Sequence, residues 1–419
     1  MRAVMFLQGP IVIVAEKPVD GMIQAFTDAG AYPVVETRWT EAPSAIDEIK
    51  PSAVVIADSD GGALGLVHAL TQRFANAGPY LPVVMRVCDK HVAPLRDVLP
   101  ISAEAPIGQM IARLSSAIRL RSLHATVIGR AKALAEERDI VADLPAGDPL
   151  DDATVLVVGR GPAYPALSTA VGERVGVMGA LSLDGAAGCL SARDIDGLVI
   201  GDGLPARALE AFFHVLADDA RFRDMPVSAL GHGVEPETLG NFIRAPEPTM
   251  LVERMLPLVR ARALEGQLKR LLASIEHKGL LDVRTGLLFT DAFNRDLDRA
   301  IDDAAERGVA LSIARFSFED EMDRRATFDA ARLISKLTRN IDFACRQDDG
   351  SIVAAFTQTD LKAAHVVARR LASVLKHTML RAGDGGPGNG PSVTLATLKD
   401  SDTAGSLIAR VTSRPVAAA

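Results

Sequence analysis

The stretch RNIDFACRQDDGSI, residues 339–352, decides the fold of the last third of this chain. Two apolar segments flank Gln347-Asp348-Asp349-Gly350-Ser351. An Asp-Gly pair in that setting is a strong β-hairpin signal, because glycine accepts the positive φ angle that such turns require. Arg339 and Asp342 form an Arg-x-x-Asp segment directly before the first apolar segment. We therefore predict an antiparallel hairpin that follows a short charged segment.

The length and composition of the chain indicate a compact α/β protein with several domains. Its 419 residues exceed what one ordinary core accommodates, so we expect about two to four domains. A hydrophobic fraction of 48% with only 4% aromatic residues suits α/β domains. The net charge of −7 lacks the basic footprint of a protein that binds duplex nucleic acid, so we expect no nucleic-acid partner.

The sequence carries no signal for a membrane or an oxidising compartment. No apolar run reaches the roughly 18 residues that a membrane span needs. Residues 1–18 have a short apolar stretch but no small-residue cleavage site, so we expect no signal peptide. Cys88, Cys189 and Cys345 share no metal or redox spacing, which is typical of buried fillers in a reducing cytosol. We expect a cytoplasmic protein without membrane insertion.

Buried-strand patterns alternate with helical patterns twice in the N-terminal part of the chain, as the βα units of parallel sheets do. The expected strands of the first module are Ile11–Ala15, Ala53–Ala57 and Pro82–Val87, and a helical pattern over residues 106–137 follows them. Those of the second module are Thr154–Val158, Gly197–Ile200 and Pro226–Leu230, and another long helical pattern follows Pro246. The repeated order predicts a duplicated α/β domain with doubly wound parallel sheets.

Composition shifts divide the chain into three modules. We expect module 1 over residues 1–142, an acidic linker over 143–153, module 2 over 154–263, a connecting helix over 264–280 and module 3 over 281–419. Pro257 is expected to kink or interrupt the helix before the connecting segment. Four residues at a/d spacing fit either a dimer coiled coil or packing on the chain's own module: Leu264, Leu268, Leu271 and Ile275.

Module 3 continues after the hairpin with a predicted helix. Thr359 is expected to cap this helix, which extends to about Met379. Its expected buried face consists of Val366, Val367, Leu371, Val374 and Leu375. Before the hairpin, residues 311–318 form another expected strand.

Modules 1 and 2 resemble response-regulator receiver domains, which implies a flavodoxin-like fold. An active receiver needs clustered carboxylates for Mg²⁺, an Asp nucleophile, and a Ser/Thr and a Lys near the phosphoryl group. Module 1 keeps Glu16 after its first strand, and Asp58 falls one residue after the nucleophile position, so Asp58 is the candidate for a vestigial phosphoacceptor. Val87 replaces the Ser/Thr, and Ala105-Pro106 replaces the Lys-Pro pair.

Module 2 departs further from the receiver pattern. Gly159-Arg160 replaces the acidic pair, and Asp202 follows Gly201, which stands at the nucleophile position. Gly231 and Ala245 stand at the Ser/Thr and Lys positions. Without acidic pair and lysine, phosphoryl transfer loses both its metal and its counter-charge. We therefore expect two pseudo-receivers that serve dimerisation and docking, with Asp202 a solvated loop residue.

Residues 280–410 resemble the GGDEF domain of diguanylate cyclases, which has a nucleotidyl-cyclase-like α+β fold. Asp282-Val-Arg-Thr-Gly-Leu-Leu288 matches the family's D-x-L-T-G-L segment, with Arg284 in place of Leu. Phe289-Thr290 replaces an Asn-Arg pair in which the Asn contacts guanine. Arg315 stands where the family has a metal-binding Asp, and a cation there would repel Mg²⁺.

The family signature itself reads Asp348-Asp349-Gly350-Ser351-Ile352 in this chain. The two glycines that approach the triphosphate are replaced by aspartates, and the metal-binding acid is replaced by glycine. With these losses the resemblance implies a degenerate GGDEF domain. We expect no catalytic residues, no metal site and no cofactor.

One ligand site of the family is retained. Arg339 and Asp342 match the inhibitory site for cyclic di-GMP, Arg346 matches the arginine before the signature, and Arg370 matches a helix arginine that completes the pocket in tandem-receiver members. Guanidinium groups bind guanine edges and phosphates, and a carboxylate accepts the N–H donors of guanine. The alternative is an i, i+3 surface ion pair and a solvated helix face around Arg369-Arg370.

The order of the modules resembles that of tandem-receiver GGDEF response regulators of the PleD type, above all their non-catalytic members. This resemblance implies a cyclic di-GMP effector or adaptor in cell-cycle control. It implies a homodimer that is recruited to a cell pole and helps to deliver regulators to an ATP-dependent protease. Two other functions stay open: a structural scaffold that ignores nucleotides, and a phosphorylation-regulated diguanylate cyclase.

Overall fold

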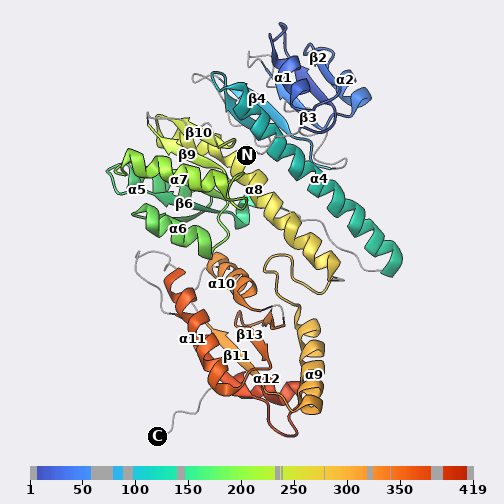
Figure 1. Cartoon of the computed structure of the whole chain (residues 1–419), viewed down its shortest axis with the longest axis vertical. Helices are drawn as coiled ribbons and strands as arrows, with labels where there is room; N and C mark the ends of the chain where they lie inside the picture. The colour runs from blue at the N-terminus through green and yellow to red at the C-terminus, as the bar shows by residue number, and fades with distance from the viewer. Residues whose placement is uncertain are drawn as a thin grey trace. The chain divides into compact units, whose positions relative to one another are not determined.

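The described residues form three β-sheets with helices on their faces (Figure 1). The computed structural model describes residues 7–57, 79–87, 98–138, 147–231, 236, 239–277, 279–318, 324–339, 341–378 and 390–412. The chain divides into two compact units. The first consists of Met1–Ala133, Asp143–Ala187 and Ile195–Lys269, and the second of Leu134–Ala142, Gly188–Asp194 and Arg270–Ala419. The first two sheets belong to the first unit and the third sheet to the second.

Module 1 contains an all-parallel sheet with the strand order β2-β1-β3-β4-β5. Its strands are β1 (Ile11–Val14), β2 (Val34–Thr37), β3 (Ala53–Ile56), β4 (Val83–Val87) and β5 (Val98–Ser102). The helices of its described part are α1 (Met22–Asp28), α2 (Ala42–Ile49) and the long α4 (Ile107–Arg138). The order 2-1-3-4-5 is one that flavodoxin-like, doubly wound sheets have.

Module 2 repeats this order in the parallel sheet β7-β6-β8-β9-β10. Its strands are β6 (Thr154–Val158), β7 (Gly176–Ala180), β8 (Gly197–Ile200), β9 (Val227–Leu230) and β10 (Phe242–Ala245). A short 3-10 helix (Pro149–Asp152) precedes them, and the helices are α5 (Tyr164–Gly172), α6 (Leu183–Ala192), α7 (Ala206–Asp218) and α8 (Pro248–Glu276). The predicted parallel α/β architecture is therefore confirmed.

The two modules of the first unit share one hydrophobic core. Residues of β5 and α4 lie in the same buried cluster as residues of β10 and α8: Leu99, Ile101, Met110 and Leu114 with Ile243, Ala245, Leu251, Met255 and Leu258. Leu150 of the 3-10 helix is buried in this cluster too. Next to it, Asp148 accepts hydrogen bonds from Arg260 of α8 at 2.8 and 2.9 Å.

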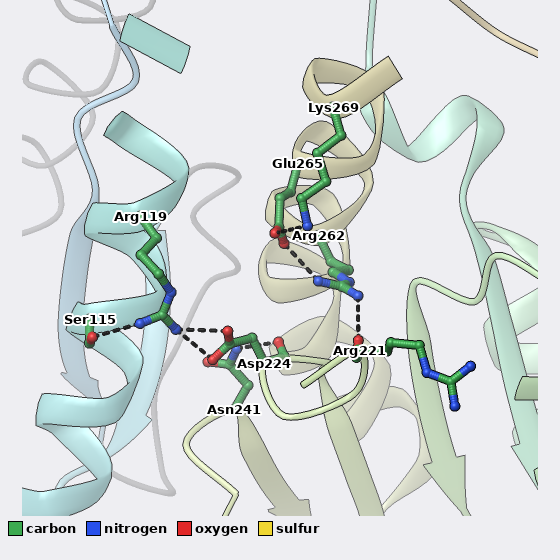
Figure 2. A network of polar contacts seen from close by, with 8 residues as sticks. All are labelled: Ser115, Arg119, Arg221, Asp224, Asn241, Arg262, Glu265 and Lys269. Atoms are coloured by element: carbon green, nitrogen blue, oxygen red, sulfur yellow. Dashed lines mark hydrogen bonds and ion pairs between the residues drawn. The ribbon is translucent and has the colours of Figure 1, made fainter. Parts of the chain in front are cut away.

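Polar contacts at the rim of this core join the modules as well (Figure 2). Arg119 of α4 donates to Ser115 at 2.8 Å and to both carboxylate oxygens of Asp224 in module 2 at 2.7 Å. Asn241 donates to the backbone carbonyl of Asp224 at 2.7 Å and fixes that loop. Arg119 is more than half exposed, so the ion pair contributes little compared with the apolar burial.

Helix α8 runs without a break from Pro248 to Glu276, although Pro257 lies inside it. The predicted interruption at Pro257 is therefore wrong. Of the four residues at a/d spacing, Leu268, Leu271 and Ile275 are buried within the single chain. This burial agrees with packing on the chain's own residues rather than with an exposed coiled-coil seam. Among the helices that the structure describes, none is both long and apolar enough to cross a membrane.

Module 3 contains an antiparallel sheet with the order β12-β13-β11-β14. Its elements are α9 (Thr290–Arg307), β11 (Leu311–Ser317), α10 (Arg324–Leu337), β12 (Phe343–Arg346), β13 (Ile352–Thr357), α11 (Leu361–Thr378), β14 (Ser392–Thr397) and α12 (Ala404–Thr412). Residues of α10 and α11 share one core cluster with one face of the sheet, and residues of α9 and α12 share another cluster with the opposite face. The predicted hairpin and the strand over residues 311–318 are confirmed.

Helix α11 differs from its prediction in two details. Its first turn is capped by Asp360, which accepts a hydrogen bond from the Ala363 amide at 2.7 Å, whereas the Thr359 hydroxyl donates to the Thr357 carbonyl. Leu371 and Leu375 are buried as predicted, but Val366 is 67% exposed. The polar face of α11 therefore contains an exposed valine.

Candidate functional site

The hairpin between β12 and β13 is a tight turn that closes on itself. Gly350 has φ +81° and donates to the Gln347 carbonyl at 2.9 Å, while the Gln347 amide donates to the Ser351 carbonyl at 2.8 Å. This is a type I turn followed by a left-handed residue, which explains why glycine stands at position 350. Asp348 and Asp349 supply the turn, as expected for residues that favour it.

Arg315 of β11 reaches across the sheet and contacts this turn. Its Nε donates to the Ser351 hydroxyl at 3.1 Å, and its Nη2 donates to Asp349 Oδ2 at 2.5 Å. The other oxygen of Asp349 accepts from the amide and the hydroxyl of Ser351. Burial raises the pKa of Asp349, but the bonds from Ser351 and the charge of Arg315 outweigh it, so this pKa lies below its ordinary value. The guanidinium of Arg315 thus lies beside the carboxylate of Asp349.

The segment Asp282–Leu288 is a structural clasp. Asp282 accepts from the Arg284 amide at 2.9 Å and from the Thr285 hydroxyl at 2.7 Å, and Gly286 has φ +74°. The Leu288 amide donates to the Ala344 carbonyl of β12, so the clasp lies against the hairpin. Phe289, which follows it, is 51% exposed. No amide side chain stands at Phe289 to read a guanine.

Arg339 and Asp342 lie at the beginning of β12, between the end of α10 and the sheet. The Asp342 amide donates to the Arg339 carbonyl at 3.0 Å, and Asp342 Oδ1 accepts from the amide of Thr357, at the end of β13, at 3.1 Å. Burial raises the pKa of Asp342, and the Thr357 bond and the charge of Arg339 offset that only in part. The Arg339 side chain is exposed. These two predicted residues are thus brought together.

Arg346 lies at the opposite end of β12. Arg346 lies four positions after Asp342, which corresponds to about 13 Å of extended strand. Its guanidinium lies 5.4 Å from the ring centroid of Phe328, and that of Arg284 lies 4.2 Å from the same ring. Arg346 therefore belongs to the surroundings of the hairpin turn, and the structure does not bring it to Asp342.

Arg370 lies on the exposed face of α11, about 13 Å along the helix axis from Leu361. A groove of about 820 Å³ follows this face, and its described lining consists of Leu361, Lys362, His365, Val366, Arg369, Arg370 and Ser373. Within the described residues, the Arg370 and Arg339 side chains make no hydrogen bond or ion pair, and Arg339 and Asp342 do not line the groove. The helical spacing of Lys362, His365 and Arg369 is the sequence signal that indicates this cationic face.

Asp202 of module 2 lies just after β8, at the carboxyl end of its parallel sheet. Asp58 lies outside the described residues. Asp202 is half-buried: its carbonyl accepts from the amides of Arg160 and Gly161 at 3.3 Å, and Oδ2 lies 3.5 Å from the Ala163 amide. The prediction of a solvated loop residue is therefore wrong, because Asp202 holds the turn after β6. In the described part of the chain, no group of His, Cys, Asp and Glu could hold a metal ion.

About a third of this chain is similar in structure to solved GGDEF domains. A sensory box/GGDEF family protein from Caulobacter crescentus is 23% identical, with 32% of this chain and 92% of that chain covered and a TM-score of 0.28. The GGDEF domain of DgcB from Caulobacter crescentus, in complex with c-di-GMP, is 18% identical, with 32% and 82% covered and a TM-score of 0.28. The FimX GGDEF domain from Pseudomonas aeruginosa is 17% identical, with 32% and 88% covered and a TM-score of 0.28.

No family model matches this sequence, and no curated protein matches it. At such TM-scores the similarity carries no argument about activity, which depends on the residues of the site.

Proposed function

We propose that this protein is a non-catalytic cyclic di-GMP effector that binds the dinucleotide through Arg339, Asp342 and Arg370. The observation that carries the proposal is a contrast within module 3. The cations of the Arg-x-x-Asp segment and of α11 are exposed and make no ion pair among the described residues, whereas Arg315 is committed to Asp349 in the former catalytic turn.

The contacts of the turn support the absence of turnover. A cyclase needs Mg²⁺ beside its signature turn and close backbone approach to a triphosphate. Here a guanidinium occupies the place beside Asp349, and two aspartates stand at the tip of the turn. Both features oppose a nucleotide triphosphate with its metal. In this proposal the turn therefore binds neither the Mg²⁺ nor the triphosphate that nucleotide synthesis requires.

The chemistry of the exposed residues supports the ligand. Cyclic di-GMP presents two phosphates and two guanine edges, for which arginine forks and one carboxylate are suitable partners. The groove along α11 adds Lys362 and Arg369 beside Arg370, together with the apolar Leu361 and Val366. Its volume of about 820 Å³ lies within the roughly 300–1,000 Å³ of small-molecule sites.

In this proposal, modules 1 and 2 bind the protein partners of the effector. They are pseudo-receivers of the PopA type that offer protein surfaces, because their phosphorylation residues are replaced at most positions. By this analogy the partners are polar localisation factors and an adaptor of an ATP-dependent protease, and the protein acts as a cytoplasmic homodimer. This part rests on resemblance, and it depends on the ligand site being active.

Calorimetric titration of the full-length chain with cyclic di-GMP tests the proposal. Arg339→Ala and Arg370→Ala should each weaken binding about ten-fold or more, because each removes charge-assisted hydrogen bonds. Arg295→Ala is the matched control. It removes an arginine from α9, which covers the opposite face of the sheet, and should change the affinity by less than about two-fold.

Three results would contradict this proposal. Undiminished affinity in both variants would mean that the dinucleotide binds away from Arg339 and Arg370. No binding by the wild type would leave the structural scaffold that ignores nucleotides. Formation of cyclic di-GMP from GTP and Mg²⁺, detected by nucleotide chromatography, would establish the cyclase instead.

A further inference from the structure

A second cavity lies within the first unit, where the carboxyl ends of the two parallel sheets meet. Its volume is about 210 Å³. Module 1 contributes the ends of β4 and β5 through Val87 and Ser102, and module 2 contributes Gly231, just after β9, and Ala245 at the end of β10. The carboxyl ends of parallel strands are where open α/β sheets bind their ligands.

Arg113 of α4 is the deepest charged residue at this cavity. Its side chain is 1% exposed. One guanidinium nitrogen donates to the Pro100 carbonyl of β5, and the other donates to the Phe242 carbonyl of β10 at 2.9 Å. Gln109, one turn earlier, donates to the same Phe242 carbonyl at 3.2 Å. Arg113 therefore bridges the edge strands of the two sheets.

The bonds to the two carbonyls do not satisfy Arg113 completely. Its Nε is buried and has no hydrogen-bond partner among the described residues. Burial without a neutralising carboxylate lowers the pKa of Arg113 to about 9. A buried, incompletely paired guanidinium carries a desolvation cost that a nearby anion would relieve.

Two further arginines line the same cavity from module 2. Arg244 lies on β10, where it also donates to the Gly231 carbonyl at 3.4 Å, and Arg254 lies on α8. The carboxylate among the described lining residues is Glu104, and its side chain is exposed. Three arginines thus line the cavity, one from a helix of module 1 and two from a strand and a helix of module 2.

We propose that this cavity binds a small phosphate-bearing anion, either inorganic phosphate or a small phosphomonoester, between the two modules. Arginine forks match phosphate oxygens, and a tetrahedral anion accepts bonds from several directions, whereas a carboxylate presents one planar edge. The cavity is smaller than the roughly 300–1,000 Å³ of sites for drug-sized ligands, which excludes a dinucleotide. The site is independent of the one on module 3, so either can fail alone.

Calorimetry of the full-length chain at constant ionic strength tests this site with inorganic phosphate, glycerol phosphate, acetate and chloride. Phosphate or glycerol phosphate should bind, and the tighter of the two identifies the source of the phosphoryl group. Arg254→Gln should weaken that binding about ten-fold or more, since it removes one charge-assisted contact from the cavity wall. Arg113→Met should abolish it. Arg113 also bridges two strands, so Arg113→Met can fail to fold. In that case the affinity of Arg254→Gln, which changes a half-buried side chain, tests the site.

Lys269→Gln is the matched control, because it removes one positive charge from the same helix outside the cavity, on an exposed side chain paired with Glu265 (Figure 2). It should change phosphate affinity by less than about two-fold. The site is refuted if phosphate binds no better than chloride, if acetate binds as well as phosphate, or if Lys269→Gln costs as much affinity as Arg254→Gln.

Discussion

Two aspartates at opposite ends of the β12–β13 hairpin have opposite electrostatic surroundings. Asp349 accepts bonds from Ser351 and Arg315, so its pKa is lowered despite burial. Asp342 is half-buried, and burial raises its pKa more than its bonds from Thr357 and the charge and backbone of Arg339 lower it. The carboxylate of Asp349 is thus engaged in hydrogen bonds within the fold. That of Asp342 keeps acceptor capacity that a ligand with N–H donors can use.

The raised pKa of Asp342 predicts how ligand binding depends on pH. The ionised carboxylate accepts the guanine N–H groups, so cyclic di-GMP affinity should fall as the pH decreases through this pKa, above the ordinary value of 3.8. Asp342→Asn should weaken binding at neutral pH about ten-fold and abolish this pH dependence. Titration calorimetry from neutral to mildly acidic pH measures both effects.

The same shift fixes the sign for stability. A raised folded-state pKa contributes stability below the unfolded value, and that contribution is lost as the pH rises through the folded value. Ionised Asp342 is therefore unfavourable for folding at neutral pH, and Asp342→Asn should not lower the free energy of unfolding there. Asp348→Asn, in the exposed turn, is the control and should retain the pH dependence of binding. A strongly destabilised Asp342→Asn protein would show that this carboxylate is structural.

At the scale of the element, the hairpin depends on the backbone of Gly350. An added Cβ would meet no atom within 4 Å, so the cost of Gly350→Ala comes from its φ of +81° alone. We expect a loss of about 1 kcal/mol in the free energy of unfolding of the second unit. Hydrogen exchange resolved by segment gives this value for each unit separately.

Gly129→Ala is the control with the opposite sign. Gly129 lies exposed inside helix α4 with no atom within 4 Å of an added Cβ, and its φ is not positive. Alanine should stabilise the first unit there by about 0.5–1 kcal/mol. Equal effects at both glycines would mean that the turn does not require the left-handed conformation.

The elements that the sequence predicted share a simple physical property. Buried strands such as β6 and β8 are short apolar runs, and the hairpin contains a specific turn pair. The apolar pattern does not predict strands β2 and β7, because they are partly exposed and carry no continuous apolar run. The strand signal of β5 is weakened by Pro100, which is unusual inside a strand, and that of β10 is weakened by Arg244, which interrupts its apolar run.

The candidate site was predictable only where it is local in sequence. Arg339 and Asp342 are three residues apart, and the structure places them together. The pairing of Arg315 with Asp349 joins residues 34 positions apart and depends on β11 lying beside β13. The apolar character of Val366 predicts a core position, yet Val366 lies on the face that lines the groove. Such contacts follow from the packing of the sheet, which periodicity does not encode.

At the scale of the whole molecule, the parallel modules differ from a chain of independent domains. The cluster that joins β5 and α4 to β10 and α8 would expose apolar side chains on both modules if they separated. Arg113 and Gln109 also bond to Phe242 across the boundary. We therefore expect the two modules to unfold as one cooperative unit, which a ligand between them would stabilise.

Met255→Ala tests this cooperativity. Met255 of α8 is fully buried in the shared cluster, so its truncation should cost about 2–5 kcal/mol. If the modules unfold together, hydrogen exchange should accelerate in β1 and β3 of module 1 as much as in β6 and β8 of module 2. Leu371→Ala, in the core of module 3, is the control and should leave both parallel sheets unchanged. Acceleration in module 2 alone would mean that each module has a stable core of its own and that their contact is only a docking surface.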